Sequence, residues 1–80
     1  MIARVYVGLK PGVLDPQGRT IAHSLNDLGF DEVQDAKQGK VIELTLSGDD
    51  REAAEARVKE MCETLLANTV IESYRIELDD

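Results

Sequence analysis

Aromatic residues and cysteine are scarce in this 80-residue sequence, which has no Trp, one Phe, two Tyr and one Cys. A chain of this length buries only roughly 60–65% of the surface that its unfolded form exposes, so we expect a small core. The single cysteine, Cys62, excludes an internal disulfide. One cysteine and one histidine, His23, also fall short of the roughly four ligands of a structural zinc site. Small domains without such supports often depend on oligomerisation, and we therefore expect a partner surface.

Positive charge is also scarce, because nine Lys and Arg residues stand against sixteen Asp and Glu, for a net charge of −7. Nucleic-acid binding needs a basic patch that displaces counterions from phosphates, so this class of partner is excluded. Apolar runs stay well short of the roughly 18 residues of a membrane span. The N-terminal residues alternate from the start and do not resemble a signal peptide. We expect a cytoplasmic protein with no membrane contact.

The motifs that carry catalysis or bind cofactors are missing as well. The sequence contains no glycine-rich phosphate-binding motif. His23 has no Ser, Cys or carboxylate at a spacing that indicates an acid–base pair, and we expect it at the surface. Cys62 lies on the apolar side of an expected helix, where it behaves as a small hydrophobic residue. We therefore expect no catalytic, cofactor-binding or metal-binding residues in this chain.

What the sequence does contain is a regular alternation of strand and helix patterns. Period-two alternation predicts strands, and apolar residues at helical spacing predict helices. The expected elements are a strand over 2–9, a helix over 15–29, a strand hairpin over 30–46 that turns at 38–40, a helix over 50–68 and a strand over 70–78. This β-α-β-β-α-β order predicts a ferredoxin-like α+β fold, an antiparallel sheet with both helices on one face. We expect one domain over residues 1–80.

The helix ends are marked by residues with specific capping roles. Asp15 and Asp50 are expected N-caps, and Pro16 suits a first helical position because that position needs no N–H. Gly29 is expected to end the first helix. Asn68 is expected to end the second in a left-handed conformation, which Asn tolerates well.

The first strand is apolar on both of its faces. Ala3, Val5 and Val7 share one face, while Ile2 and Tyr6 lie on the other. A strand of this kind is commonly covered on both sides, and an apolar open sheet face seldom stays in water. We expect a homodimer or homotetramer that associates through Ile2, Tyr6 and Tyr74.

Two short stretches contain apolar residues where a solvated loop does not favour them. One precedes the first helix and the other joins the second helix to the last strand, and loop apolar residues beside Pro and Gly often belong to an interface. Gly18 also lowers helix propensity, which suggests close approach of a partner. The expected partner interface comprises Val13, Leu14, Asp15, Gln17, Gly18, Asn68, Val70 and Ile71.

These stretches resemble the PurS-type small subunits of phosphoribosylformylglycinamidine (FGAM) synthase over essentially the whole chain. The resemblance is in V-G-L-K-P-G-V-L-D-P-Q-G (Val7 to Gly18), L-G-F (Leu28 to Phe30), G-K-V-I-E-L (Gly39 to Leu44) and M-C-E-T-L-L-A-N-T-V-I-E-S-Y (Met61 to Tyr74). The family usually has Pro after the Asn, where this chain has Thr69.

The resemblance implies a role in purine biosynthesis without chemistry of its own. In this family a large synthetase subunit binds ATP and Mg and forms the amidine, and a glutaminase subunit releases ammonia. The small subunit joins the two and helps to enclose the ammonia path. The chain is then inactive alone but required in a glutamine-dependent C–N ligase. The alternative is an ACT-like module that senses a small molecule near residues 12–18.

Overall fold

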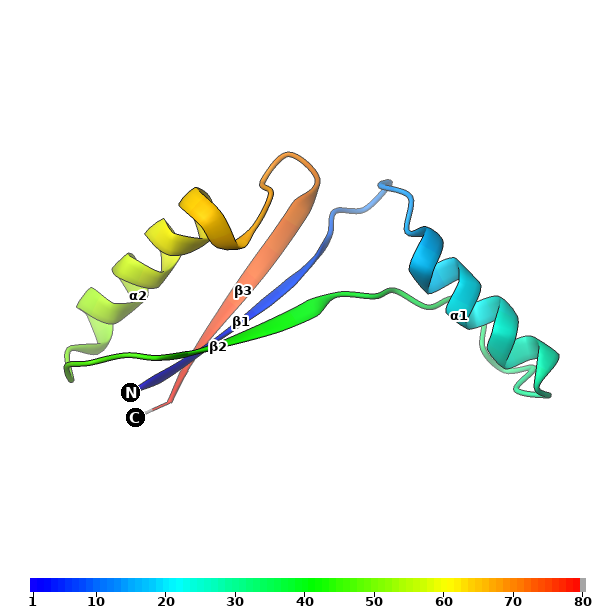
Figure 1. Cartoon of the computed structure of the whole chain (residues 1–80), viewed down its shortest axis with the longest axis horizontal. Helices are drawn as coiled ribbons and strands as arrows, with labels where there is room; N and C mark the ends of the chain where they lie inside the picture. The colour runs from blue at the N-terminus through cyan, green and yellow to red at the C-terminus, as the bar shows by residue number, and fades with distance from the viewer. Residues whose placement is uncertain (80) are drawn as a thin grey trace.

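The computed structural model describes residues 1–79, which form an antiparallel sheet and helices in the order β1, α1, β2, α2, a π-helical turn and β3 (Figure 1). Within these residues the sheet has three strands in the order β2-β1-β3. The bounds are Ile2–Leu9 for β1, Pro16–Asp27 for α1, Lys40–Thr45 for β2, Arg51–Met61 for α2, Cys62–Leu66 for the π-helical turn and Glu72–Asp79 for β3. The α+β class and the antiparallel sheet of the ferredoxin-like fold are confirmed.

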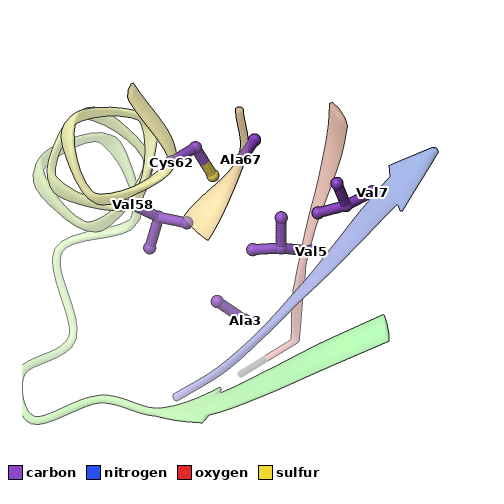
Figure 2. Packing of buried hydrophobic residues seen from close by; sticks show 6 residues of the cluster. All are labelled: Ala3, Val5, Val7, Val58, Cys62 and Ala67. Carbon is purple, nitrogen blue, oxygen red and sulfur yellow. The ribbon is translucent and has the colours of Figure 1, made fainter. Parts of the chain in front are cut away.

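The core lies between one face of the sheet and α2. Val5 is paired with Ile42 of β2 and with Ile76 of β3. Figure 2 shows the side chains from β1 facing those from α2 and the segment after it. The buried residues are Ala3, Val5, Val7, Val58, Cys62 and Ala67. The face of β1 that carries Ala3, Val5 and Val7 is therefore the core face. Among the residues described, the buried core contains no aromatic side chain.

Both helices begin at the predicted caps. The Asp15 carboxylate accepts a hydrogen bond from the Gly18 N–H at 2.9 Å, and Pro16 occupies the first turn of α1. The Asp50 carboxylate accepts from the Ala53 N–H at 3.2 Å. Gly29 follows α1 with a φ of 99°, a conformation that glycine adopts without strain. These cap predictions are therefore confirmed. Capping depends only on local backbone chemistry, so the sequence is enough to predict it.

The end of α2 differs from the prediction. Its last turn widens into a π-helical turn, in which the Ala67 N–H donates to the Cys62 carbonyl at 3.0 Å. Among residues 1–79 only glycines have positive φ, so the left-handed conformation expected of Asn68 is wrong. The Asn68 side chain instead accepts from the Val70 N–H at 3.2 Å, and its carbonyl accepts from the Glu72 N–H at 2.7 Å. Asn68 shapes the turn into β3, which begins at Glu72.

The predicted strand around Val33 is absent, because no strand lies between α1 and β2 in residues 1–79. Side chains occupy the backbone groups that such a strand needs. The Asn26 side-chain amide donates to the carbonyls of Phe30 and Val33, both at 3.0 Å. The Gln38 N–H donates to the Asp15 carboxylate at 2.8 Å. These bonds hold residues 28–39 as an irregular segment between α1 and β2, which we call the return segment.

The expectation that both helices cover one face of the sheet also fails. Only α2 lies over the sheet, whereas α1 projects beyond its end (Figure 1). The radius of gyration is 16.0 Å, against about 12 Å for a compact chain of this length. We call residues 10–39 the arm, and residues 1–9 with 40–79 the body. The connections to the arm lead away from the sheet, and α1 does not pack on the body.

Candidate interaction site

The structure brings together the two stretches that the sequence singled out. The backbone N–H of Lys10 donates to the Ile71 carbonyl at 2.8 Å, and the Lys10 ammonium donates to the Thr69 carbonyl at 2.7 Å. The loop over residues 10–15 therefore lies beside the loop over residues 67–71. We call these two segments the tip loops. Residues more than 50 positions apart in sequence form one surface.

Apolar side chains stand in solvent on the tip loops. Leu14 is 81% exposed, Val70 82% and Ile71 39%. Val13 is half-buried, while Gln17 at the start of α1 and Asn68 are exposed. Large exposed apolar side chains that adjoin one another are typical of protein–protein contacts. The partner interface stays a prediction. Its apolar part consists of Val13, Leu14, Val70 and Ile71.

Asp15 has a structural role at the base of the arm. One carboxylate oxygen accepts from the Gly18 N–H at 2.9 Å and the other from the Gln38 N–H at 2.8 Å. These two N–H groups, with Gly18 the larger influence, lower the pKa of Asp15. The carboxylate thus fixes the start of α1 to the return segment before β2. A small cavity of about 270 Å³ beside it is lined by Gln17 and Lys40 among others.

Gly18 is explained within the chain, which corrects the expectation that a partner requires it. Gly18 is buried, and a Cβ built on it would overlap the Ala36 carbonyl oxygen. The return segment therefore passes directly over the first turn of α1. Gly39 makes a similar approach to β1, since a Cβ there would lie 2.6 Å from the Val7 carbonyl oxygen. Gly18 lets two segments of the arm pack together, and Gly39 lets the arm approach the end of the body.

The open face of the sheet, where Ile2 and Tyr6 were expected to mediate self-association, is largely charged. Arg4 pairs with Glu43 at 3.2 Å and with Asp79, and Asp79 is the main cause of the raised Arg4 pKa. Ile2 lies on the same face at the start of β1, where it is paired with Thr45 of β2. The face is therefore more polar than the sequence alternation suggested.

Tyr6 is part of a second charged group on the open face. Its hydroxyl donates to Glu77 at 3.1 Å, and the Arg75 guanidinium lies 4.2 Å from the centre of its ring. Arg75 also pairs with Glu77 at 2.6 Å, and this pair is the main reason that the Glu77 pKa is lowered. Tyr6 already has intrachain partners for its hydroxyl and its ring.

Tyr74 lies on the opposite face from Ile2 and Tyr6, so the structure does not group the three residues on one surface. It is paired with Val7, a core residue. Its hydroxyl donates to the Glu63 carboxylate at 2.7 Å, and this bond raises the pKa of Tyr74 to about 12. Tyr74 therefore links β3 to the π-helical turn.

The two residues considered for chemistry occupy the places that the sequence predicted. The His23 side chain is 79% exposed, as expected, but the statement that no carboxylate is spaced to pair with it is wrong, because Asp27 lies 3.5 Å away, one helical turn along α1. Cys62 is fully buried, and burial raises the pKa of its thiol, which disfavours the nucleophilic thiolate. Residues 1–79 hold no cluster of three or more potential metal ligands. No helix in that part of the chain is long and apolar enough to cross a membrane.

One further surface was not predicted. An apolar groove of about 430 Å³ runs between α2 and β2, lined mainly by Leu44, Met61, Leu65 and Leu66. Leu65 is 82% exposed. The signal in the sequence is the width of the apolar stripe on α2, because Leu65 and Leu66 extend it beyond the part that faces the sheet.

Known proteins resemble the chain over almost its full length. The family model for PurS, described as phosphoribosylformylglycinamidine (FGAM) synthase, matches residues 2–80. The PurS subunit of Bacillus subtilis FGAM synthase is 53% identical over 77 residues, which cover 96% of this chain and 90% of that protein. These matches give the ACT-like sensor no support.

Solved structures agree with the family match. A crystal structure of Methanocaldococcus jannaschii PurS, described as a subunit of formylglycinamide ribonucleotide amidotransferase in the purine biosynthetic pathway, superposes with a TM-score of 0.91 at 42% identity, covering 99% of this chain and 95% of that one. A chain in the structure of PurLQS from Thermotoga maritima gives a TM-score of 0.84 at 32% identity, with 96% of each chain covered. This chain belongs to the PurS family of FGAM synthase subunits.

Proposed function

We propose that this chain is the small, non-catalytic subunit that joins the glutaminase and synthetase subunits of FGAM synthase. The observation that carries the proposal is the match to PurS proteins along the chain, including a chain of the Thermotoga maritima PurLQS structure. In the assembly the subunit helps ammonia pass from the glutaminase to the synthetase. It acts where the other subunits act, in the cytoplasm.

The arrangement of side chains supports a joining role. The exposed apolar residues Leu14, Val70 and Ile71 lie on two loops that are held side by side, where they offer a partner subunit a preformed surface. Charged residues such as Arg4 and Glu43 form ion pairs on the open face of the sheet. ATP and Mg belong to the synthetase subunit in this proposal, and this chain binds no cofactor.

Self-association is part of the same proposal. The body has a small core without aromatic residues, and the arm gains almost nothing from it. A chain of 80 residues rarely gains enough stability for a folded monomer from so small a core. A homodimer or homotetramer supplies the missing contacts, and its melting temperature then rises with protein concentration.

Reconstitution tests the joining role directly. The synthetase and glutaminase subunits are assayed for glutamine-dependent FGAM formation with and without this chain. We expect a large increase on its addition, and neither glutamine hydrolysis nor ATP consumption by the chain alone. Ammonia-dependent FGAM formation by the synthetase is the control, because it needs no joined glutaminase. Equal glutamine-dependent rates with and without the chain would contradict the proposal.

A further inference from the structure

A network of short-range hydrogen bonds holds the turn that leads into β3. The Asn68 carbonyl accepts from the Ile71 N–H at 3.1 Å and from the Glu72 N–H at 2.7 Å, which makes one helical turn. The Asn68 side chain accepts from the Val70 N–H at 3.2 Å. In return, the Glu72 carboxylate accepts from the Asn68 N–H at 2.6 Å. The two ends of the turn therefore cap each other, in the manner of a capping box.

The residues inside this turn do not favour its shape. Thr69, Val70 and Ile71 are all β-branched, and β-branched side chains favour extended backbone over helical turns. Burial adds little, because Val70 is 82% exposed and Ile71 39%. The turn therefore depends on the hydrogen bonds made by Asn68 and Glu72, rather than on intrinsic propensity or on packing.

Lys10 holds the same turn from the other tip loop. Its ammonium donates to the Thr69 carbonyl at 2.7 Å, and its backbone N–H donates to the Ile71 carbonyl at 2.8 Å. Lys10 and Glu72 thus both use their charged groups on the backbone of the turn. Hydrogen bonds in which one partner is ionised are stronger than those between neutral groups. The two charged side chains fix the backbone of the turn, which presents Val70 to solvent.

Resting on the proposed joining role, we infer that Glu72 is a positioning residue, which holds the turn over residues 68–72 in the shape that a partner subunit of FGAM synthase binds. The contact itself is made by exposed apolar side chains of the tip loops, Leu14 and Val70, against an uncharged apolar surface of the partner. A loop that is already ordered loses less conformational entropy on binding, so preorganisation raises affinity. Glu72 is not part of the buried core, so its loss should act on binding rather than on folding.

Glu72→Ala tests the positioning role against Glu72→Gln. Alanine removes the acceptor for the Asn68 N–H, whereas the side-chain oxygen of glutamine keeps it. Each variant is titrated into a mixture of the synthetase and glutaminase subunits, and glutamine-dependent FGAM formation is measured. We expect Glu72→Ala to need roughly tenfold more chain for half-maximal activity, with an unchanged maximal rate. Glu72→Gln should match the unmodified chain, as should Glu55→Ala, the control that removes an exposed carboxylate from α2.

Amide hydrogen exchange of the isolated chain reports on the order of the turn itself. In Glu72→Ala the amides of Val70 and Ile71 should exchange about tenfold faster, while the melting temperature hardly changes. Thr69→Pro in the Glu72→Ala chain should restore most of the lost affinity, because proline fixes φ at the first position of a helical turn. Restoration by an uncharged residue separates ordering of the turn from a direct contact between Glu72 and the partner.

Two results of the titration would overturn the positioning role. One is normal half-maximal activity of Glu72→Ala despite faster exchange, and the other is equal weakening by Glu72→Gln, which would indicate a charge contact with the partner. If Glu72→Ala does not fold, Lys10→Met releases the same turn at the Thr69 carbonyl. Weaker binding of Lys10→Met would then support the inference, and normal binding would overturn it.

The same titration separates the positioning role from the joining role. If the unmodified chain raises the rate of glutamine-dependent FGAM formation, the joining role stands even where Glu72→Ala behaves normally. If the unmodified chain gives no increase, the joining role is contradicted, and the positioning role falls with it.

Discussion

The body and the arm of this chain solve the problem of apolar burial in opposite ways. In the body, Val5, Val58 and Cys62 are completely buried between the sheet and α2. In the arm, Ile21 of α1 and Leu28 at its C-cap remain exposed although they follow the same helical spacing. An amphipathic helix pattern thus says that a face will be buried, but not in which molecule. The buried apolar cluster lies in the body, and the arm contributes none of its residues.

A charge in the body is expected to have the largest effect. Val58→Asp places an unpaired carboxylate in the core, which costs several kcal/mol, comparable to the total stability of a small domain. We expect loss of the cooperative thermal transition in circular dichroism. Leu28→Asp in the arm is the comparison variant and should lower the melting temperature only through weaker self-association. Its effect should vanish at low protein concentration, and unfolding of both variants alike would contradict the division into body and arm.

The packing inside the arm should be sensitive to a single methyl group. Gly18→Ala forces a Cβ against the Ala36 carbonyl, and overpacking of this kind typically costs about 1–3 kcal/mol. We expect a melting temperature lower by several degrees and a weaker homo-oligomer. Gly8→Ala is the matched control, because no atom lies within 4 Å of a Cβ at that position. A stabilised Gly18→Ala variant would mean that the return segment does not pass over α1.

The tip loops should affect assembly without affecting the fold. Leu14→Ala removes a side chain that is 81% exposed, so the melting temperature of the isolated chain should hardly change. An apolar side chain buried in a partner contributes about 1.5–3 kcal/mol, so binding to the large subunits should weaken about ten- to a hundredfold. Titration of the reconstituted enzyme measures this change. Val41→Ala, at an exposed apolar site outside the tip loops, should bind normally, and unfolding of Leu14→Ala would place Leu14 in the core.

The smallest expected effect is a titration within the body. Hydrogen bonding to Glu63 favours the protonated form of Tyr74 and raises its pKa to about 12 in the folded chain, against about 10 when unfolded. This contribution to stability is fully present below pH 10 and disappears between about pH 10 and pH 12. In a Tyr6→Phe chain, ultraviolet absorbance should show a tyrosine midpoint near 12. Glu63→Gln should move the midpoint down toward 10, and an unchanged midpoint would argue against the bond.

Much of the local structure could be predicted from the sequence. The caps at Asp15 and Asp50, the glycine stop at Gly29 and the core face of β1 follow from backbone chemistry and residue spacing, which act within a few positions. The burial of Cys62 follows in the same way. The motifs of Val7 to Gly18 and Met61 to Tyr74 also indicated the PurS family, which the comparisons confirm.

What only the tertiary structure decided is where distant segments meet. Lys10 brings the two tip loops together, and Asp15 with Gly18 joins the start of α1 to the segment before β2. The strand expected around Val33 failed because the carbonyls of Phe30 and Val33 are bonded to the Asn26 side chain, a competition that strand alternation cannot reveal. Spacing along a chain fixes which residues share a face. Whether that face packs on its own sheet depends on the path of the backbone, which long-range contacts determine.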